Sequence, residues 1–204
     1  MNSEKRSIEN PAVPLTSTKI LEYLGLEKTA AGVSVTPDSS LNISAVYSAV
    51  RVLAEAIAVI PLQLFERTDR GRILLNKDPL YSLLHDEPNT FMDSFIWREL
   101  QMTYLCLWGN GYSYIERDPL GRSRALIPIH PDNCEPVYDP KSKKIFYMVS
   151  IDGKREIIEQ SNILHFKGLS FDGIVGKSPL RLARESYGLS LATQKFGSRF
   201  FGNG

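Results

Sequence analysis

The stretch LWGNGYSYIER, residues 107–117, divides the sequence into a helical part and a β-rich part. Asp93 is a suitable N-cap for the segment just before it, DSFIWRELQMTYLCLW, whose apolar residues recur at helical spacing. The Gly-Asn-Gly run ends that helix, because glycine accepts the left-handed backbone conformation of a helix C-terminus. The sequence therefore predicts a long helix that turns directly into a strand.

Downstream, residues 112–166 consist of short runs rich in β-branched and aromatic residues, separated by the turn sequences DPLGR, DPKSKK and DGK. This pattern predicts an antiparallel β meander. With helices before the meander and a helix after it, we expect an α+β fold.

Upstream, residues 44–60 place apolar side chains at intervals of three and four, from a possible N-cap at Ser44 to the break at Pro61. The segment is so rich in Ala, Val and Ile that we expect this helix to be largely buried. LQLFERTDRGRILL reads as a hairpin, and Asp78 with Pro79 reads as the start of one helical turn. Residues 1–40 read as a flexible N-terminal arm, with a short helix at residues 19–24.

The stretch GIVGKSPL, residues 173–180, ends like a phosphate-binding loop but lacks the glycine that such a loop needs at position 171, which is Phe. The alternative is a helix start, with Ser178 as N-cap and Pro179 at the first helical position, where a missing N–H does no harm. We favour the helix start, and we expect a helix of about 20 residues over residues 178–201.

The composition excludes several classes of protein. The formal net charge is +1, from 24 basic and 23 acidic residues, which does not indicate a protein wrapped in nucleic acid. Cys106 and Cys134 are too few for a disulfide scaffold and suggest a reducing cytosolic origin. His85, His130 and His165 have no metal-binding spacing, and no run of about 20 apolar residues could span a bilayer. We expect no metal, no cofactor and no membrane partner.

No catalytic constellation is convincing. Ser113, in GYSYI, departs from the nucleophile elbow G-x-S-x-G at its last position, so it reads as an ordinary strand residue. His165 could be a sheltered general base, although a structural histidine is the favoured interpretation. The basic residues Arg184, Lys195 and Arg199 could face a polyanion, and a solvated helix face is the favoured alternative.

Taken in order, the motifs resemble those of the tailed-phage portal protein (head-tail connector) family over residues 32–204. The similarity runs through VTPDSSLNISAVYSAVRVLAEAIAVIPLQLFER, DPLYSLLHDEPN, LWGNGYSYIERDPLGRSRALIPIHPDNCEPVYD and ILHFKGLSFDGIVGKSPL. The resemblance implies an architectural role for the PN, GNxY and GxSPL positions, which are Pro88, Asn89, Gly109, Asn110, Gly111, Tyr112, Gly176, Ser178, Pro179 and Leu180.

The resemblance also implies a function. Portal proteins form a ring, usually of twelve subunits, at one capsid vertex, and double-stranded DNA passes through the ring during packaging and ejection. The implied partners are the terminase large subunit, head-completion and tail-adaptor proteins, the capsid protein and non-specifically bound DNA. The protein would be assembled in the host bacterial cytoplasm, would reside in the virion and would not be an enzyme.

By this resemblance, residues 41–177 form a wing-like α+β domain, and residues 178–204 begin a stem-like helix whose Arg184, Lys195 and Arg199 face DNA in the channel. Members of the family continue into further stem, clip, wing and crown segments, so we expect this chain to be a fragment. Two alternatives remain open: a small cytosolic hydrolase that uses Ser113 or His165, and a different virion adaptor protein.

Overall fold

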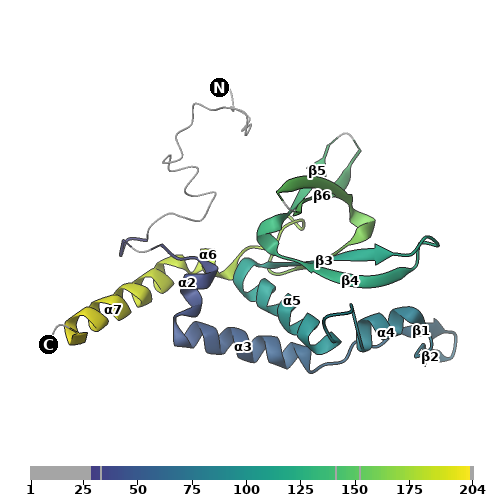
Figure 1. Cartoon of the computed structure of the whole chain (residues 1–204), viewed down its shortest axis with the longest axis horizontal. Coiled ribbons are helices and arrows are strands. Elements are labelled where there is room, and N and C mark those ends of the chain that lie inside the picture. The colour runs from purple at the N-terminus through teal and green to yellow at the C-terminus, as the bar shows by residue number, and fades with distance from the viewer. Residues whose placement is uncertain (1–28, 33, 141, 152, 203–204) are drawn as a thin grey trace. The chain divides into compact units, whose positions relative to one another are not determined.

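The computed structural model of the protein describes residues 29–32, 34–140, 142–151 and 153–202 (Figure 1). These residues form helices and antiparallel sheets, which confirms the α+β prediction. The chain forms two compact units: one joins Met1–Ile43 to Ala183–Gly204, and the other is Ser44–Leu182. The helix predicted at residues 19–24 and most of the predicted arm lie outside the described residues. The domain boundaries at 40 and 177 stay predictions.

The first unit contains helices α2 (Pro37–Leu41) and α7 (Arg184–Gly202). A reciprocal capping box starts α2: Ser39 N–H donates to Thr36 Oγ1 at 3.1 Å, and Thr36 N–H donates to Ser39 Oγ at 2.8 Å. The sequence did not reveal this helix, because five residues are too few to show a helical period.

The final helix differs from its prediction as a single segment over residues 178–201. A turn at Ala183 separates α6 (Pro179–Leu182) from α7. Leu182 N–H bonds to Ser178 O, and Tyr187 N–H bonds to Ala183 O, so one set of helical bonds ends where the next begins. The sequence hides the break because neither Gly nor Pro stands there.

The other helices belong to the second unit. Two predicted caps of these helices are confirmed: Asp78 accepts the N–H of Leu80 at 2.8 Å, and Asp93 accepts the N–H of Ile96 at 2.8 Å. Ser44, also predicted as a cap, is instead the first residue of its helix. The helix after Asp78 runs for seven residues, longer than the single turn predicted. These helices are α3 (Ser44–Ala58), α4 (Pro79–His85) and α5 (Ser94–Trp108).

Helix α3 is less buried than its composition predicts. One side packs on α5, where Arg98 donates from Nε and Nη2 to Ala58 O at 3.0 and 2.8 Å. The buried residues of α3 are Val46, Ala54 and Ala58, whereas Val52 is 64% exposed. The prediction of a largely buried helix was therefore wrong, because no described residue covers its second apolar side.

The β region forms two three-stranded sheets, and the prediction of one meander was wrong. In the first sheet, β8 returns to pair with β3, which places His165 opposite Tyr112. Only the second sheet is a meander. A turn sequence indicates that the two strands beside it are neighbours. It does not indicate that a later strand, such as β8, pairs with a much earlier one, such as β3. The first sheet is β4 (Ser123–Ile129), β3 (Asn110–Arg117) and β8 (Ile163–Lys167), and the second is β5 (Cys134–Asp139), β6 (Lys144–Ile151) and β7 (Lys154–Glu159).

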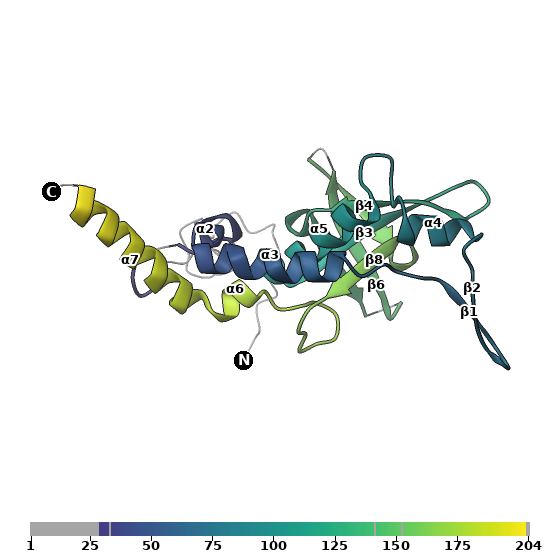
Figure 2. The same ribbon diagram turned by 90° about the horizontal axis from the view of Figure 1, so that it is seen from below.

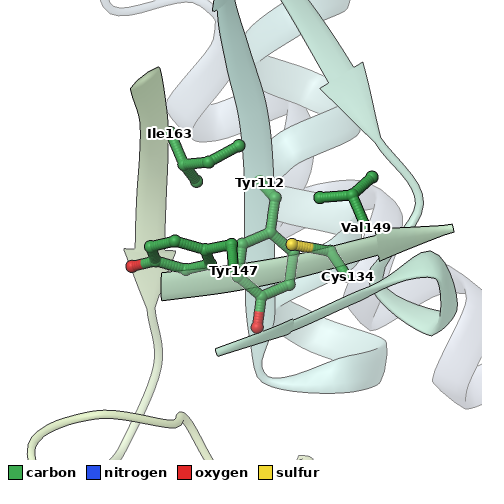
Figure 3. Close-up of a cluster of buried hydrophobic side chains, with 5 residues drawn as sticks. All are labelled: Tyr112, Cys134, Tyr147, Val149 and Ile163. Atoms are coloured by element: carbon green, nitrogen blue, oxygen red, sulfur yellow. The ribbon is translucent and has the colours of Figure 1, made fainter. Parts of the chain in front are cut away.

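The main core of this unit lies between the two sheets (Figure 3). Its side chains come from strands of both sheets: Tyr112, Cys134, Tyr147, Val149 and Ile163. The predicted hairpin is confirmed as β1 (Phe65–Thr68) and β2 (Gly71–Leu74), and Figure 2 shows it as a separate two-stranded ribbon. Its strands pair with no other strand among the described residues.

Candidate functional site

The glycine motifs meet where α5 ends and β3 begins. Gly109 ends α5 with a φ of 78°, and its carbonyl accepts the N–H of Gly168 at 2.9 Å. The loop of residues 168–178 crosses this point so closely that a Cβ on Gly109 would overlap the carbonyl of Lys177. A Cβ on Gly176 would overlap the carbonyl of Gly109. Backbone therefore packs on backbone here, and both positions require glycine.

Asn110 clamps the loop by bonding both backbone polar groups of one residue, Gly176. Its Oδ1 accepts the N–H of Gly176 at 2.7 Å, and its Nδ2 donates to the carbonyl of Gly176 at 2.8 Å. Further along the loop, Ser178 Oγ donates to Leu107 O at 2.7 Å. These bonds join segments about 70 residues apart in sequence and hold the loop against the end of α5.

His165 supports the clamp from β8. Its Nε2 lies 3.1 Å from Asn110 Oδ1, and its Nδ1 lies 3.2 Å from the hydroxyl of Tyr147. An amide oxygen only accepts, so the proton is on Nε2, and Nδ1 accepts from Tyr147. Burial, together with the charge of Lys167, lowers the pKa of His165 to about 4. The imidazole is therefore neutral near pH 7.

Acidification should destabilise the protein through His165. The pKa is near 6.5 in the unfolded chain and about 4 in the folded one, so below pH 6.5 the unfolded state binds the proton first. We expect the free energy of unfolding to fall by about 2 kcal/mol as pH drops from 7 to 4.5. Urea titrations at both pH values measure this loss. In His165→Gln the loss should shrink, and an equal loss in both proteins would contradict the prediction.

A side chain of the loop also accepts hydrogen bonds from the loop's own backbone N–H groups. Asp172 Oδ1 accepts the N–H groups of Ile174 and Val175 at 2.8 and 2.9 Å and the hydroxyl of Ser170 at 3.0 Å. These bonds lower the pKa of Asp172 to about 2. N–H groups that a phosphate would need are thus already bonded to a carboxylate, which argues against a phosphate-binding loop. Pro179 begins α6, as the helix-start interpretation predicts.

The residues considered for hydrolysis do not come together. Ser113 is fully buried, and its Oγ accepts from Trp97 Nε1 at 3.0 Å and from Gln101 Nε2 at 3.1 Å. It pairs with Leu164, so it lies on the opposite face of the sheet from His165. A buried hydroxyl whose oxygen already accepts two hydrogen bonds is a poor nucleophile for an external substrate. The described residues contain no cluster of metal-binding side chains and no helix able to cross a membrane.

The remaining motif positions also make backbone contacts. Asn89 donates from Nδ2 to Leu126 O at 2.9 Å, and the carbonyl of Pro88 accepts the N–H of Leu126 at 2.7 Å. The PN element therefore bonds both backbone polar groups of Leu126 on the outer edge of β4. A Cβ on Gly111 would lie 2.6 Å from Oε1 of Gln101, so the end of that side chain would have to shift to admit it.

The three candidate DNA-facing cations share one face of α7. Lys195 lies eleven residues after Arg184, and Arg199 lies four residues after Lys195. At about 100° per residue, all three fall within roughly 60° of the helix circumference. Lys195 and Arg199 are exposed, and Arg184 is partly buried.

Several buried polar residues gave no recognisable signal in the sequence. Arg98 bonds the last carbonyl of α3, where a cation also favours the negative end of the helix dipole. Trp97 and Gln101 both bond Ser113. Their roles depend on partners that no local pattern specifies, although polar residues on the buried face of a helical period are themselves a weak indication.

The hydrogen bonds of Asn110 and Asn89 define an α+β protein in which the motif residues hold together backbone segments that are far apart in sequence. The chain belongs to the phage portal protein family, because the sequence pattern of that family matches residues 44–204. It is 31% identical over 173 residues to the portal protein of Enterobacteria phage HK97, covering 84% of this chain and 40% of that protein. It is also 31% identical over 183 residues to the probable portal protein of Streptomyces phage phiC31, covering 86% and 40%.

Solved structures share the fold. A chain from the neck of an empty gene transfer agent particle aligns with a TM-score of 0.68 at 22% identity, covering 81% of this chain and 44% of that one. A neck of the native particle, computed with C12 symmetry, gives a TM-score of 0.62 at 17% identity, covering 89% and 50%. The chain thus spans about 40% of the length of the curated phage relatives that it matches.

Proposed function

We propose that the protein is a subunit of a phage portal, a ring at one capsid vertex through which double-stranded DNA is packaged and ejected. The observation that carries the proposal is the family match over residues 44–204, with 31% identity to the HK97 portal protein. The ring is assembled in the host bacterial cytoplasm and resides in the virion. Its partners are the capsid protein, the terminase large subunit and the head-completion and tail-adaptor proteins.

The proposed role is mechanical, without catalysis. A conduit must keep its shape while DNA moves through it, and interlocked backbone segments suit that demand. The clamp of Asn110 on Gly176 and the contact of Ser178 with Leu107 fix a loop without long side chains that could rearrange. The Ser113 and His165 contacts favour this role over the hydrolase alternative, because both side chains are engaged in structural bonds.

Ring formation tests the proposal. Light scattering and electron-microscope images should show closed rings with a central hole, and by analogy with the family the ring has about twelve subunits. The measurement is made on this chain and on a chimaera that carries the C-terminal part of the HK97 relative. A monomer in both samples would contradict the proposal, and a closed ring attached elsewhere on the virion would favour the adaptor alternative.

We further propose that the basic face of α7 contacts DNA phosphates without reading sequence. Replacing Lys195 and Arg199 together by Gln should weaken duplex binding and reduce the slope of log affinity against log salt by about 2, since each phosphate contact contributes about 0.9. Fluorescence anisotropy over a salt series measures both. Lys143→Gln with Lys144→Gln removes the same charge from the start of β6 and the turn before it, and should leave the slope unchanged. Equal effects of the two pairs would contradict the proposal.

A further inference from the structure

An apolar groove with an acidic rim opens between the two sheets of the second unit. Its volume is about 780 Å³, and residues of β3, β4, β6 and β7 line it. The apolar part includes Tyr114, Ile127 and Val149, and the rim carries Glu156 and Glu159. A groove of this size admits several side chains of a protein partner.

The acidic rim has no partner of its own. Glu156 lies opposite Val149 in the pairing of β6 with β7, so its side chain is on the groove side of the sheet. Glu159 lies opposite Phe146, so its side chain leaves the end of β7 on the other face. Both Glu156 and Glu159 are exposed, and neither makes an ion pair with a described residue. The groove therefore suits a partner that combines apolar and basic side chains.

The β1–β2 hairpin has that combination on one face. Phe65 lies opposite Leu74, and Arg67 lies opposite Arg72, so all four side chains point to the same side. Two arginines directly opposite each other repel. Neither arginine has an acidic partner among the described residues, although the guanidinium of Arg72 lies 4.6 Å from the ring centre of Phe65.

The hairpin also lacks support from its own chain. Both strands are almost entirely exposed, and an isolated two-stranded hairpin is at best marginally stable in water. A partner that covers its apolar base and neutralises its paired arginines would stabilise it. An acidic, apolar groove supplies both interactions.

We propose that the β1–β2 hairpin of one subunit docks into the groove between the two sheets of the next subunit. Arg67 and Arg72 then meet Glu156 at the rim, and Phe65 and Leu74 cover the apolar lining. This inference rests on the proposed ring, because two different complementary surfaces on each copy produce a head-to-tail contact that closes into a ring. The occupant of the groove is thus a second copy of this chain.

Charge reversal tests the contact. Arg67→Glu with Arg72→Glu, or Glu156→Arg, should raise the concentration needed for assembly about tenfold or more, because like charges then face each other. The three substitutions combined should restore assembly to within about threefold of the original chain. Lys143→Glu with Lys144→Glu is the matched control and should have no effect. Failure of the triple variant to recover would overturn the proposal.

Cross-linking identifies the occupant directly. A photoreactive benzoylphenylalanine replaces Arg70 at the hairpin tip in ¹⁵N-labelled protein, which is mixed with unlabelled protein and irradiated. The expected products join labelled hairpins to unlabelled β4 or β7 peptides. Closed rings whose hairpins cross-link to another segment, or only within one copy, would overturn the docking proposal and leave the portal function standing. A monomer without intermolecular products, in this chain and in the chimaera with the HK97 relative, would overturn both.

Discussion

Replacing Gly176 by alanine will destabilise the second unit by about 3 kcal/mol. The added methyl group would overlap the carbonyl of Gly109 and lie 2.9 Å from the amide nitrogen of Gly168. Both neighbours are backbone atoms, so relief requires separating the loop from the end of α5. That separation also breaks the two bonds that Asn110 makes with Gly176.

Urea unfolding followed by tryptophan fluorescence measures the effect, since Trp97 and Trp108 both lie on α5. Gly121→Ala is the matched control in the same unit. Gly121 has a φ of 79° but open space around its Cβ, so the cost there is backbone strain of about 1 kcal/mol. A Gly176→Ala variant no less stable than this control would show that the loop does not pack as described.

Replacing Asn110 by leucine will cost about 3 kcal/mol, although the side chain keeps a similar volume. The change removes the partners of the Gly176 N–H, the Gly176 carbonyl and the Nε2 of His165. Each polar group left buried without a hydrogen bond costs about 1 to 3 kcal/mol. The loss should appear in urea unfolding and as faster amide hydrogen exchange at Gly176.

Asn162→Leu provides the comparison. Asn162 accepts one bond, from Nε of Arg117 at 3.0 Å, in an exposed setting where water can replace the lost partner. Its loss should be within about 1 kcal/mol. Similar losses at positions 110 and 162 would mean that the clamp contributes little to stability.

The helical part of the fold was predictable because its signals are local. Asp78 and Asp93 cap their helices through N–H groups two and three residues away, and Gly109 ends α5 in the conformation that glycine favours. The β1–β2 hairpin follows from the turn residues between its strands. In each case the partner lies within a few residues, so the sequence pattern contains the whole interaction.

The prediction of one meander was wrong because strand pairing depends on the core. Nothing near residues 163–167 shows that β8 pairs with β3, since that choice buries Tyr112, Tyr147 and Ile163 between two sheets. The exposure of one side of α3 was not predicted for a related reason. Its composition indicates burial, but the described residues of this chain cover only one side.

The sequence by itself therefore determined the α+β class, the caps at Asp78 and Asp93, the hairpin and, through its ordered motifs, the portal family. Only the tertiary structure decided what the motifs do. Asn110 meets Gly176, and Ser178 meets Leu107, across separations of 66 and 71 residues. The three cations of α7 share a face only once the helix is formed. These relations depend on the path of the backbone through space, which no local run of residues contains.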